Sequence, residues 1–254
     1  MSTTRVPLHL APRTPRLLQD GARGFVLVLA GGGYAGRSDH EGPGIAAWLA
    51  DQGIAAASLD YPVAPARYPA ALEQVLLALA DLRAGVHGDV RGPLVLAGSS
   101  AGGHLAGTVA TVTRAERQAL ATRTGTHDPL RRPDLVTMNY PVFSLVDHAH
   151  LGSRIALLGQ DHPEQLAVDL SIENRVDADV PPAFVWHTAD DAVVPVENTL
   201  AAISAWRSVR VEVEGHVYPR GKHGIGLALG ETDAVAAWPA HWLAWLHRHG
   251  VHPA

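Results

Sequence analysis

The stretch LVLAGSSAGGHLAG, residues 94–107, joins a short apolar run to a dense cluster of small residues. The apolar run predicts a buried strand, and the next five residues, Gly98–Gly102, fit the pattern G-x-S-x-G. In a nucleophile elbow of this pattern, a sharp turn from strand to helix raises a serine hydroxyl above the sheet. The stretch therefore predicts Ser100 as a nucleophile and Ser99 as a filler. Taken alone, the motif also fits a plain glycine-rich turn whose serines cap a helix.

Segments typical of strands and of helices alternate along the chain around this stretch. The alternation favours a mostly parallel α/β sheet with helices on both faces. Residues 140–181 are irregular, with short helical pieces, and are expected to form loops or a small cap over the strand ends. Strands are predicted at Phe25–Ala30, Ile54–Leu59, Pro93–Ala97, Leu135–Met138, Ala183–His187 and Val209–Tyr218, and helices at Ile45–Gln52, Ala71–Gly85, His104–Val112, Glu197–Arg207 and Ala234–His249.

Composition favours one large domain over residues 1–254. Of these residues 47% are hydrophobic and 18% charged, which supplies a large core, and no repeat or linker divides the chain. The net charge of −5 predicts neither nucleic acid nor an anionic membrane as a partner. The absence of cysteine excludes disulfides, thiolate metal sites and a cysteine nucleophile. Without a signal-peptide pattern or an apolar run of membrane-spanning length, a cytoplasmic location is expected.

Two loops after later strands carry the polar residues that an elbow serine needs. In this type of site an aspartate or glutamate and then a histidine follow the serine in the chain. The loop HTADDAVVP, residues 187–195, contains adjacent aspartates, and the loop RGKHGIGLA, residues 220–228, contains His223. Singly, these are unremarkable, since surface aspartates often cap helices and the chain has 15 histidines. Their order and their place at strand ends together favour a triad of Ser100, Asp190 or Asp191, and His223.

The loop AGGGYAGRS, residues 30–38, follows the first buried strand and predicts an oxyanion hole. Three consecutive glycines let backbone N–H groups approach an acyl oxygen, as in the HGGG-type loop of lipases and esterases. Ala30 takes the place of the histidine in that loop, so another group must order the hole. His40 and Glu41 follow closely, but a position at the start of a helix is favoured for Glu41 over a role in ordering the loop.

The same loop allows a competing interpretation as a nucleotide-binding site. Gly31, Gly33 and Gly36 spell G-x-G-x-x-G after a strand, and Asp60 ends the next strand, as in a dinucleotide-binding fingerprint. Residues 31–38 also differ from a P-loop only in having Arg37 where lysine belongs. Both interpretations need a helix to begin within the glycines, so that its N-terminus meets phosphate. The segment RSDHEGPG delays the predicted helix, which makes nucleotide binding the less favoured alternative.

With these motifs in place, the chain resembles the α/β-hydrolases, and within them the small acetylxylan-esterase-like and lipase-like serine esterases. The resemblance extends from about Val26 to Trp245. One departure is Pro62 in LDYPVAP, where relatives often have arginine. The stretches that carry the resemblance are GGGYAGRSDHEG, LDYPVAP, GSSAGGHLA, PPAFVWHTADDAVVPVENTL and YPRGKHGIGLA.

The resemblance implies a role for each candidate site residue. It implies Ser100 as nucleophile, His223 as base, and Asp191 as the acid, because residues 191–195 fit D-x-x-V-P. The implied oxyanion donors are the backbone N–H groups of Ala101 and of Gly32 or Gly33. Family members usually need no cofactor and no metal, and they cleave short acyl esters, often acetyl groups on sugars.

The predicted function is therefore a serine esterase that hydrolyses short-chain acyl esters of carbohydrates or similar small alcohols through an acyl-enzyme. Its expected partner is a small-molecule ester. Two alternatives remain open at this point. One is the nucleotide-binding α/β protein described above, and the other is a hydrolase fold that binds ligands with an idle triad. The oligomeric state, the pathway and the alcohol part of the substrate are not predicted.

Overall fold

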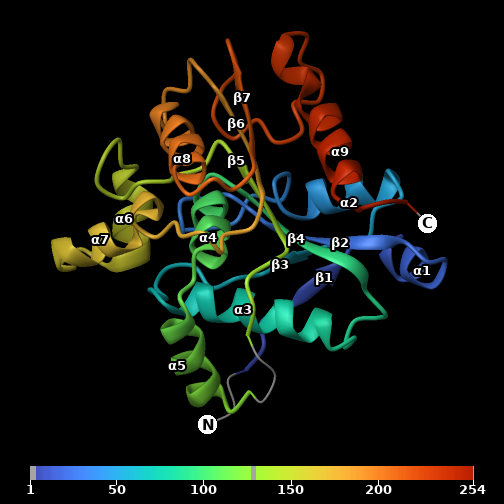
Figure 1. Ribbon diagram of the computed structural model, residues 1–254. Coiled ribbons are helices and arrows are strands. Elements are labelled where there is room, and N and C mark those ends of the chain that lie inside the picture. Colours follow the sequence, from blue (N-terminus) through green and yellow to red (C-terminus); the bar gives the residue numbers. More distant parts are fainter. Residues whose placement is uncertain (1–3, 127–129, 254) are drawn as a thin grey trace.

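The sheet of the computed structural model, which describes residues 4–126 and 130–253, runs in the order β1-β3-β2-β4-β5-β6-β7 (Figure 1). Strands β2 to β7 are parallel, and β1 pairs antiparallel with β3 at one edge. The fold is that of an α/β hydrolase, as the sequence predicts. The strands are β1 (Leu8–Leu10), β2 (Arg23–Leu29), β3 (Ala56–Leu59), β4 (Arg91–Ser99), β5 (Leu135–Asn139), β6 (Ala183–Thr188) and β7 (Val213–Tyr218).

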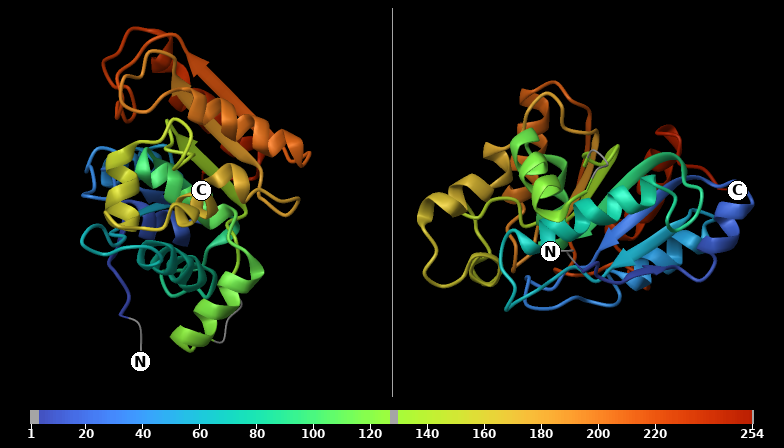
Figure 2. Two further views of the ribbon diagram at one scale, coloured as in Figure 1. Left: turned by 90° about the vertical axis from the view of Figure 1, so that its left-hand side faces the viewer. Right: turned by 90° about the horizontal axis from the view of Figure 1, so that it is seen from below.

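Helices cover both faces of this sheet (Figures 1 and 2). On one face α2 and α9 pack together, with Trp48 stacked on Trp242, and α3, α4 and α8 lie on the other. The helices are α1 (Thr14–Gln19), α2 (Pro43–Asp51), α3 (Ala70–Arg83), α4 (Ala101–Ala110), α5 (Arg114–Thr124), α6 (Leu151–Leu158), α7 (Glu164–Leu170), α8 (Glu197–Ser208) and α9 (Trp238–Arg248), with 3-10 helices η1 (Ile172–Asn174) and η2 (Ala234–Ala237).

The central strands are buried because both of their faces are covered. Every residue of β2 after Arg23 is buried, as are all five residues of β5. A continuous apolar run rather than an alternating pattern is the signature of such a strand, which is why these segments are predictable from sequence. Among the described residues, no helix has the length and apolar character needed to cross a membrane.

Several boundaries differ from the predicted ones for local reasons. The last strand starts at Val213 rather than Val209, because α8 continues to Ser208 and Arg210 then turns with a φ of 61°. The helix after the elbow starts at Ala101 rather than His104. Residues 140–181 contain α6, α7 and η1, and η1 packs against α4 and α8.

Three elements, β1, α1 and α5, were not predicted from the sequence. The first two are only three and six residues long. Helix α5 is mostly polar and buries only Leu120, so it lacks an apolar stripe. Its ends do carry signals: Thr113 and Glu116 form a capping box, and Gly125 ends the helix in the left-handed conformation.

Parallel pairing places the carboxyl ends of β2, β4, β5, β6 and β7 along one edge of the sheet. In open α/β sheets, ligands bind in the crevice outside this edge. The glycine-rich loop after β2, the elbow after β4 and the two polar loops after β6 and β7 therefore meet there.

Candidate active site

The turn between β4 and α4 holds Ser100 in a strained backbone conformation. Its φ of 53° and ψ of −117° are unusual for a residue with a side chain. A β-carbon on Gly98 would overlap the carbonyl group of Gly102, and one on Gly102 would overlap the carbonyl oxygen of Leu29. Both outer glycines of the motif are therefore required by backbone contacts, as the sequence pattern predicts.

The two adjacent serines of the turn have different surroundings. Ser99 is fully buried, and its Oγ accepts a hydrogen bond of 3.1 Å from the side-chain amide of Asn139 on β5. Ser100 is 7% exposed, and its Oγ lies 2.8 Å from Nε2 of His223. Only Ser100 is placed to react with a bound molecule.

The hydrogen-bonded chain continues from His223 to the loop after β6. Nδ1 of His223 lies 2.6 Å from Oδ2 of Asp191, whose side chain is fully buried. The other carboxylate oxygen accepts hydrogen bonds from the backbone N–H groups of Val193 and Val194. Burial by itself would raise the pKa of Asp191, but hydrogen bonds from His187, from His223 and from these two N–H groups outweigh it and hold this pKa well below its usual range.

The neighbouring Asp190 points to a different part of the loop cluster. Its side chain is exposed and accepts a 2.8 Å hydrogen bond from the backbone N–H of Gly221. Asp190 therefore supports the loop that carries His223 without contacting the imidazole. The structure thus brings Ser100, Asp191 and His223 together and leaves Asp190 outside the chain of side-chain contacts.

The glycine-rich loop after β2 bends sharply beside the elbow. Gly32 and Gly33 have φ angles of 133° and 63°, and the N–H groups of Ala35 and Gly36 both donate to the carbonyl of Gly32. Within the described part of the chain, the N–H groups of Gly32 and Gly33 donate no hydrogen bond. Ala101 is the first residue of α4, and the N–H groups of a first helical turn have no acceptor within the helix. These groups are free to bind an anionic oxygen.

Features that nucleotide binding would require are absent from this loop. Helix α2 begins only at Pro43, well beyond the glycines, so the glycines do not form the helix N-terminus that both competing motifs need. Asp60 and Arg37, which the competing motifs would assign to ribose and phosphate, lie 3.4 Å apart as an ion pair. The nucleotide-binding alternative is not favoured.

A family model for the alpha/beta hydrolase fold matches residues 26–227. The chain belongs to this family.

Within this family, the relatives include enzymes named for ester hydrolysis. The chain is 31% identical over 210 residues to an acetylxylan esterase of Xylanibacter ruminicola. This match covers 79% of this chain and 41% of that protein. It is also 31% identical over 221 residues to endo-1,4-beta-xylanase B of Butyrivibrio fibrisolvens, covering 84% of this chain and 34% of that protein. The chain thus spans only about a third to two fifths of the length of these two curated relatives.

A solved structure shares most of the hydrolase fold. The acetyl ester-xyloside bifunctional hydrolase of Caldicellulosiruptor lactoaceticus superposes with a TM-score of 0.78 and 36% identity. The match covers 89% of this chain and 83% of that one. At 36% identity, the two chains are alike in sequence as well as in fold over the matched region.

The strand-end site contains a second histidine, the buried His187, which sequence reasoning missed. Nε2 of His187 lies 3.2 Å from Oδ2 of Asp191 and 2.9 Å from the carbonyl oxygen of Val194. Both neighbours accept, so Nε2 carries a proton, and Nδ1 accepts from the hydroxyl of Thr199 at 2.9 Å. His187 therefore fixes the position of Asp191. The spacing of four residues between them was the available signal.

Nitrogen and oxygen atoms of His187, Asp191 and His223 lie within 4.8 Å of one another, which is close enough for a metal ion. Each of these atoms already takes part in a hydrogen bond to another member of the group. The side chains of His187 and Asp191 are also completely covered. A metal ion could bind here only by breaking these hydrogen bonds, so the donor set fits hydrogen bonding better than metal binding.

Glu41 does not cap a helix, which is the role that the sequence favoured for it over ordering the glycine loop. It is 3% exposed, and no side-chain cap is present at the start of α2. Its Oε1 accepts a 2.7 Å hydrogen bond from the hydroxyl of Tyr140, which in turn accepts from the N–H of Gly226. The ring of Tyr140 meets that of His223 edge-on at 5.2 Å. Glu41 and Tyr140 thus link the segment after the glycine loop to the loop that carries His223.

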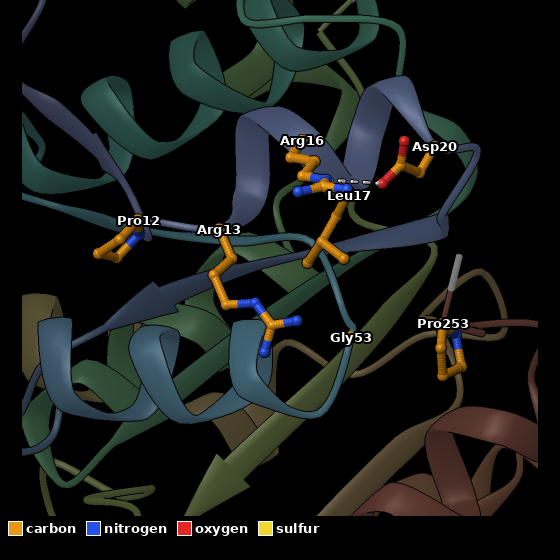
Figure 3. A pocket seen from close by; sticks show the side chains of 7 residues that line it. All are labelled: Pro12, Arg13, Arg16, Leu17, Asp20, Gly53 and Pro253. Atoms are coloured by element: carbon orange, nitrogen blue, oxygen red, sulfur yellow. Dashed lines mark hydrogen bonds and ion pairs between the residues drawn. The ribbon is translucent and has the colours of Figure 1, made fainter.

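A surface hollow on the opposite edge of the sheet offers no comparable chemistry (Figure 3). It lies by the amino-terminal ends of β2 and β3, between α1 and the end of α2, and Arg13 and Arg16 line it (Figure 3). Arg16 pairs with Asp20, and Arg13 with Asp51. The hollow contains no serine or histidine, so the strand-end site remains the candidate active site.

Proposed function

We propose that the chain is a serine esterase that hydrolyses short-chain acyl esters through a covalent acyl-enzyme. The observation that carries this proposal is the continuous series of hydrogen bonds from Ser100 Oγ through His223 to Asp191, at 2.8 Å and 2.6 Å. Such a series, with the serine on a strained turn at the strand ends, is the arrangement that activates a hydroxyl for acyl transfer.

In the proposed first step, Ser100 attacks the carbonyl carbon of the ester. Nε2 of His223 takes the hydroxyl proton, while Asp191 accepts from Nδ1–H and holds the imidazole in the useful tautomer. The carbonyl oxygen becomes an oxyanion near the N–H groups of Ala101 and of Gly32 or Gly33, and each such donor is worth about 3 kcal/mol. His223 then returns the proton to the departing alcohol.

In the proposed second step, water releases the acid from the acyl-enzyme. His223 removes a proton from the water as its oxygen attacks the acyl carbon, and the same proton restores the hydroxyl of Ser100. Apart from the ester and the water, both proposed steps use only side chains and backbone N–H groups of this chain. The catalytic residues proposed are therefore Ser100, His223 and Asp191.

Acetyl esters of carbohydrates are the substrate class that we propose. The names of the relatives support this choice, since one is an acetylxylan esterase and the superposed structure is an acetyl ester-xyloside hydrolase. The glycine loop adds a physical argument, because the Oγ of Ser153 and the ring of His150 lie beside Gly33. Polar groups next to the proposed oxyanion donors suit a small, polar ester.

A fluorophosphonate probe tests whether the site is active or idle. An activated serine displaces fluoride, so that a P–O bond forms as the P–F bond breaks, whereas an unactivated serine reacts negligibly. We expect stoichiometric labelling at Ser100, located by peptide mass spectrometry, together with hydrolysis of p-nitrophenyl acetate. A folded protein that neither reacts with the probe nor hydrolyses the ester would instead be a binding protein with an idle triad.

A further inference from the structure

The side chain of Tyr34 anchors the glycine-rich loop to helix α4. Tyr34 follows Gly33 directly, is 2% exposed and has a φ of 59°, a conformation that a bulky residue adopts only when its surroundings hold it. Its hydroxyl lies 2.8 Å from Nδ1 of His104, and the two rings meet edge-on. The loop is therefore tied to α4 by a buried side chain.

The direction of this hydrogen bond follows from the other nitrogen of His104. Nε2 lies 3.0 Å from the carbonyl oxygen of Leu170, at the end of α7, and a carbonyl can only accept. Nε2 therefore carries the proton, and Nδ1 accepts from the hydroxyl of Tyr34. Burial lowers the pKa of His104 to about 4 and raises the pKa of Tyr34 well above its usual value. Both groups are neutral at physiological pH, so this arrangement persists.

Other contacts hold the loop at points on either side of the tyrosine ring. The carbonyl of Tyr34 accepts a 2.7 Å hydrogen bond from the N–H of Ala64, and the hydroxyl of Tyr61 donates to the carbonyl of Ala30 at 2.6 Å. These bonds connect the loop to the segment after β3. Only the bond from Tyr34 to His104 connects the loop directly to the helix that begins at the elbow, among side-chain hydrogen bonds of the described residues.

The two ends of this bond lie close to the two sets of proposed oxyanion donors. Tyr34 is the residue after Gly33, and His104 lies one helical turn after Ala101, with its N–H donating to the carbonyl of Ser100 at 3.1 Å. A change in the bond would therefore shift the glycine N–H groups relative to the N–H of Ala101. Shifts of about 1 Å in such groups are enough to cost roughly a hundredfold in rate.

We propose that the Tyr34–His104 hydrogen bond is a positioning device, which sets the spacing between the two halves of the oxyanion hole. Both are positioning residues, since neither touches the reacting atoms. An HGGG-type loop has a histidine where this chain has Ala30, whose side chain cannot form a hydrogen bond. The bond between Tyr34 and His104 orders the glycine loop instead. This inference rests on the proposed esterase function.

Removal of one hydroxyl tests the proposal. Tyr34→Phe keeps the buried ring and deletes only the donor, and Tyr218→Phe is a matched control. The hydroxyl of Tyr218 also bonds to a histidine, 2.7 Å from Nδ1 of His241, where β7 meets α9. Each variant is assayed for kcat and KM with p-nitrophenyl acetate, and for melting temperature. A third measurement is inhibition by a short-chain trifluoromethyl ketone, to which Ser100 adds while His223 takes its proton, leaving an oxyanion in the hole.

The expected result separates catalysis from stability. Tyr34→Phe should lower kcat by about tenfold or more and leave KM within about twofold, and it should weaken binding of the ketone by about the same factor as kcat. Both variants should lower the melting temperature by similar amounts, but Tyr218→Phe should leave kcat and the ketone affinity unchanged. A merely structural role for Tyr34 would predict the same pattern for both variants.

Two variants at position 104 add a test by partial replacement. His104→Asn retains an acceptor near the position of Nδ1, whereas His104→Leu retains none. We expect His104→Asn to keep more of the wild-type kcat, and His104→Leu combined with Tyr34→Phe to be no slower than the slower single variant.

The proposal would be overturned if Tyr34→Phe kept the wild-type kcat and ketone affinity, or if its loss appeared in KM alone. Failure of the proposed function is a different result, in which the wild-type protein itself neither hydrolyses the ester nor binds the ketone.

Discussion

Two glycine-rich segments follow neighbouring buried strands in this molecule, and they keep their shapes by different means. In the elbow after β4, the glycines at 98 and 102 are required by contacts with backbone within the turn and on the adjacent strand. In the loop after β2, Gly32 is likewise required by backbone, because its β-carbon would overlap the carbonyl group of Gly36, but the loop also makes contacts with side chains outside it, chiefly His104, Tyr61 and Glu41. A turn fixed by backbone alone is specified by a short motif, whereas a loop that also needs distant partners is specified only in part.

Both segments left an alternative open in the sequence. G-x-S-x-G taken alone also fits a plain glycine-rich turn before a helix, but the polar loops after two later strands favour the nucleophile elbow. The spacing of Gly31, Gly33 and Gly36 fits an oxyanion loop and a nucleotide loop equally well. The late start of α2 and the pairing of Arg37 with Asp60 disfavour the second, and neither is visible in the glycines.

The largest expected effect concerns the two serines of the elbow. Ser100→Ala should abolish ester hydrolysis, with a loss of about 10⁴ to 10⁶ in kcat, because the nucleophile is gone. Ser99→Ala should keep most of the activity, since Ser99 is fully buried and its Oγ, which accepts from Asn139, does not face a bound molecule. Steady-state assays of both variants, with circular dichroism to check folding, decide the matter. Equal losses in two folded variants would contradict the assignment of Ser100.

The adjacent aspartates give the next largest effect and extend the comparison to a third loop. Asp191→Asn should lower kcat by about 10⁴, because the amide cannot hold the imidazole of His223 in the required tautomer. Asp190→Asn should cost far less, since Asp190 accepts only from the N–H of Gly221 and an amide oxygen can still accept. The ratio of the two kcat values is the measurement. The reverse ranking would move the acid to Asp190.

Alanine substitution at one glycine of each segment tests the comparison itself. Gly102→Ala should destabilise the fold by about 3 kcal/mol or more, because its β-carbon would meet the carbonyl oxygens of Leu29 and Ala30. Gly36→Ala should change the free energy of unfolding by less than about 1 kcal/mol, since its β-carbon would meet nothing within 4 Å. Urea denaturation of both variants measures the difference. Similar losses at the two sites would mean that the loop is as locally constrained as the elbow.

Much of the architecture was predictable because it depends on local pattern. The buried parallel strands appear as continuous apolar runs and the more exposed β7 as a partly alternating segment, so six strands and the place of the candidate site at their carboxyl ends could be predicted. Polar α5 and the short elements β1 and α1 lack a comparable pattern. The grouping of Ser100, Asp191 and His223 needed the resemblance to choose between two aspartates, because adjacent residues on a loop differ only in direction.

The supporting residues of the site could not be predicted for a related reason. Tyr34 and His104 are 70 positions apart, and Glu41 and Tyr140 are 99 apart. Nothing in either neighbourhood identifies its partner until the sheet brings them together. Such pairs require the tertiary structure, whereas His187 and Asp191, four residues apart, carried a spacing that could have been noticed.

A smaller effect is expected from the buried imidazole that anchors the loop. Burial lowers the pKa of His104 to about 4, from about 6.5 in the unfolded chain. Between these values the unfolded state binds a proton that the folded state does not, so the stability present above pH 6.5 is lost as the pH falls towards 4, by up to about 1.4 kcal/mol per unit. His104→Asn cannot titrate and should lose about 1 to 2 kcal/mol less than wild type between pH 6.5 and 5 in urea denaturation. Parallel pH profiles would show that His104 is not the group responsible.

The smallest expected effect concerns the acyl group and the space beside the glycine loop. Acetyl esters should be preferred over octanoyl esters by roughly tenfold in kcat/KM. A long acyl chain gains about 0.8 kcal/mol for each buried methylene only if an apolar groove receives it. Next to Gly33, however, the nearest side chains are polar, with Ser153 Oγ at 3.7 Å and His150 Cε1 at 4.0 Å from the position of a β-carbon.

A p-nitrophenyl ester series from acetyl to octanoyl, kept below the micelle limit, measures this preference. A loop held tightly against α4 by Tyr34 leaves the polar wall in place, so the rate should fall as the chain lengthens. In Tyr34→Phe, whose loop is less firmly held, the preference for acetyl should weaken while the absolute rate drops. If kcat/KM instead climbs steadily with chain length in the wild-type protein, an apolar groove receives the acyl group, and a deacetylase of small polar esters is the wrong description of this hydrolase.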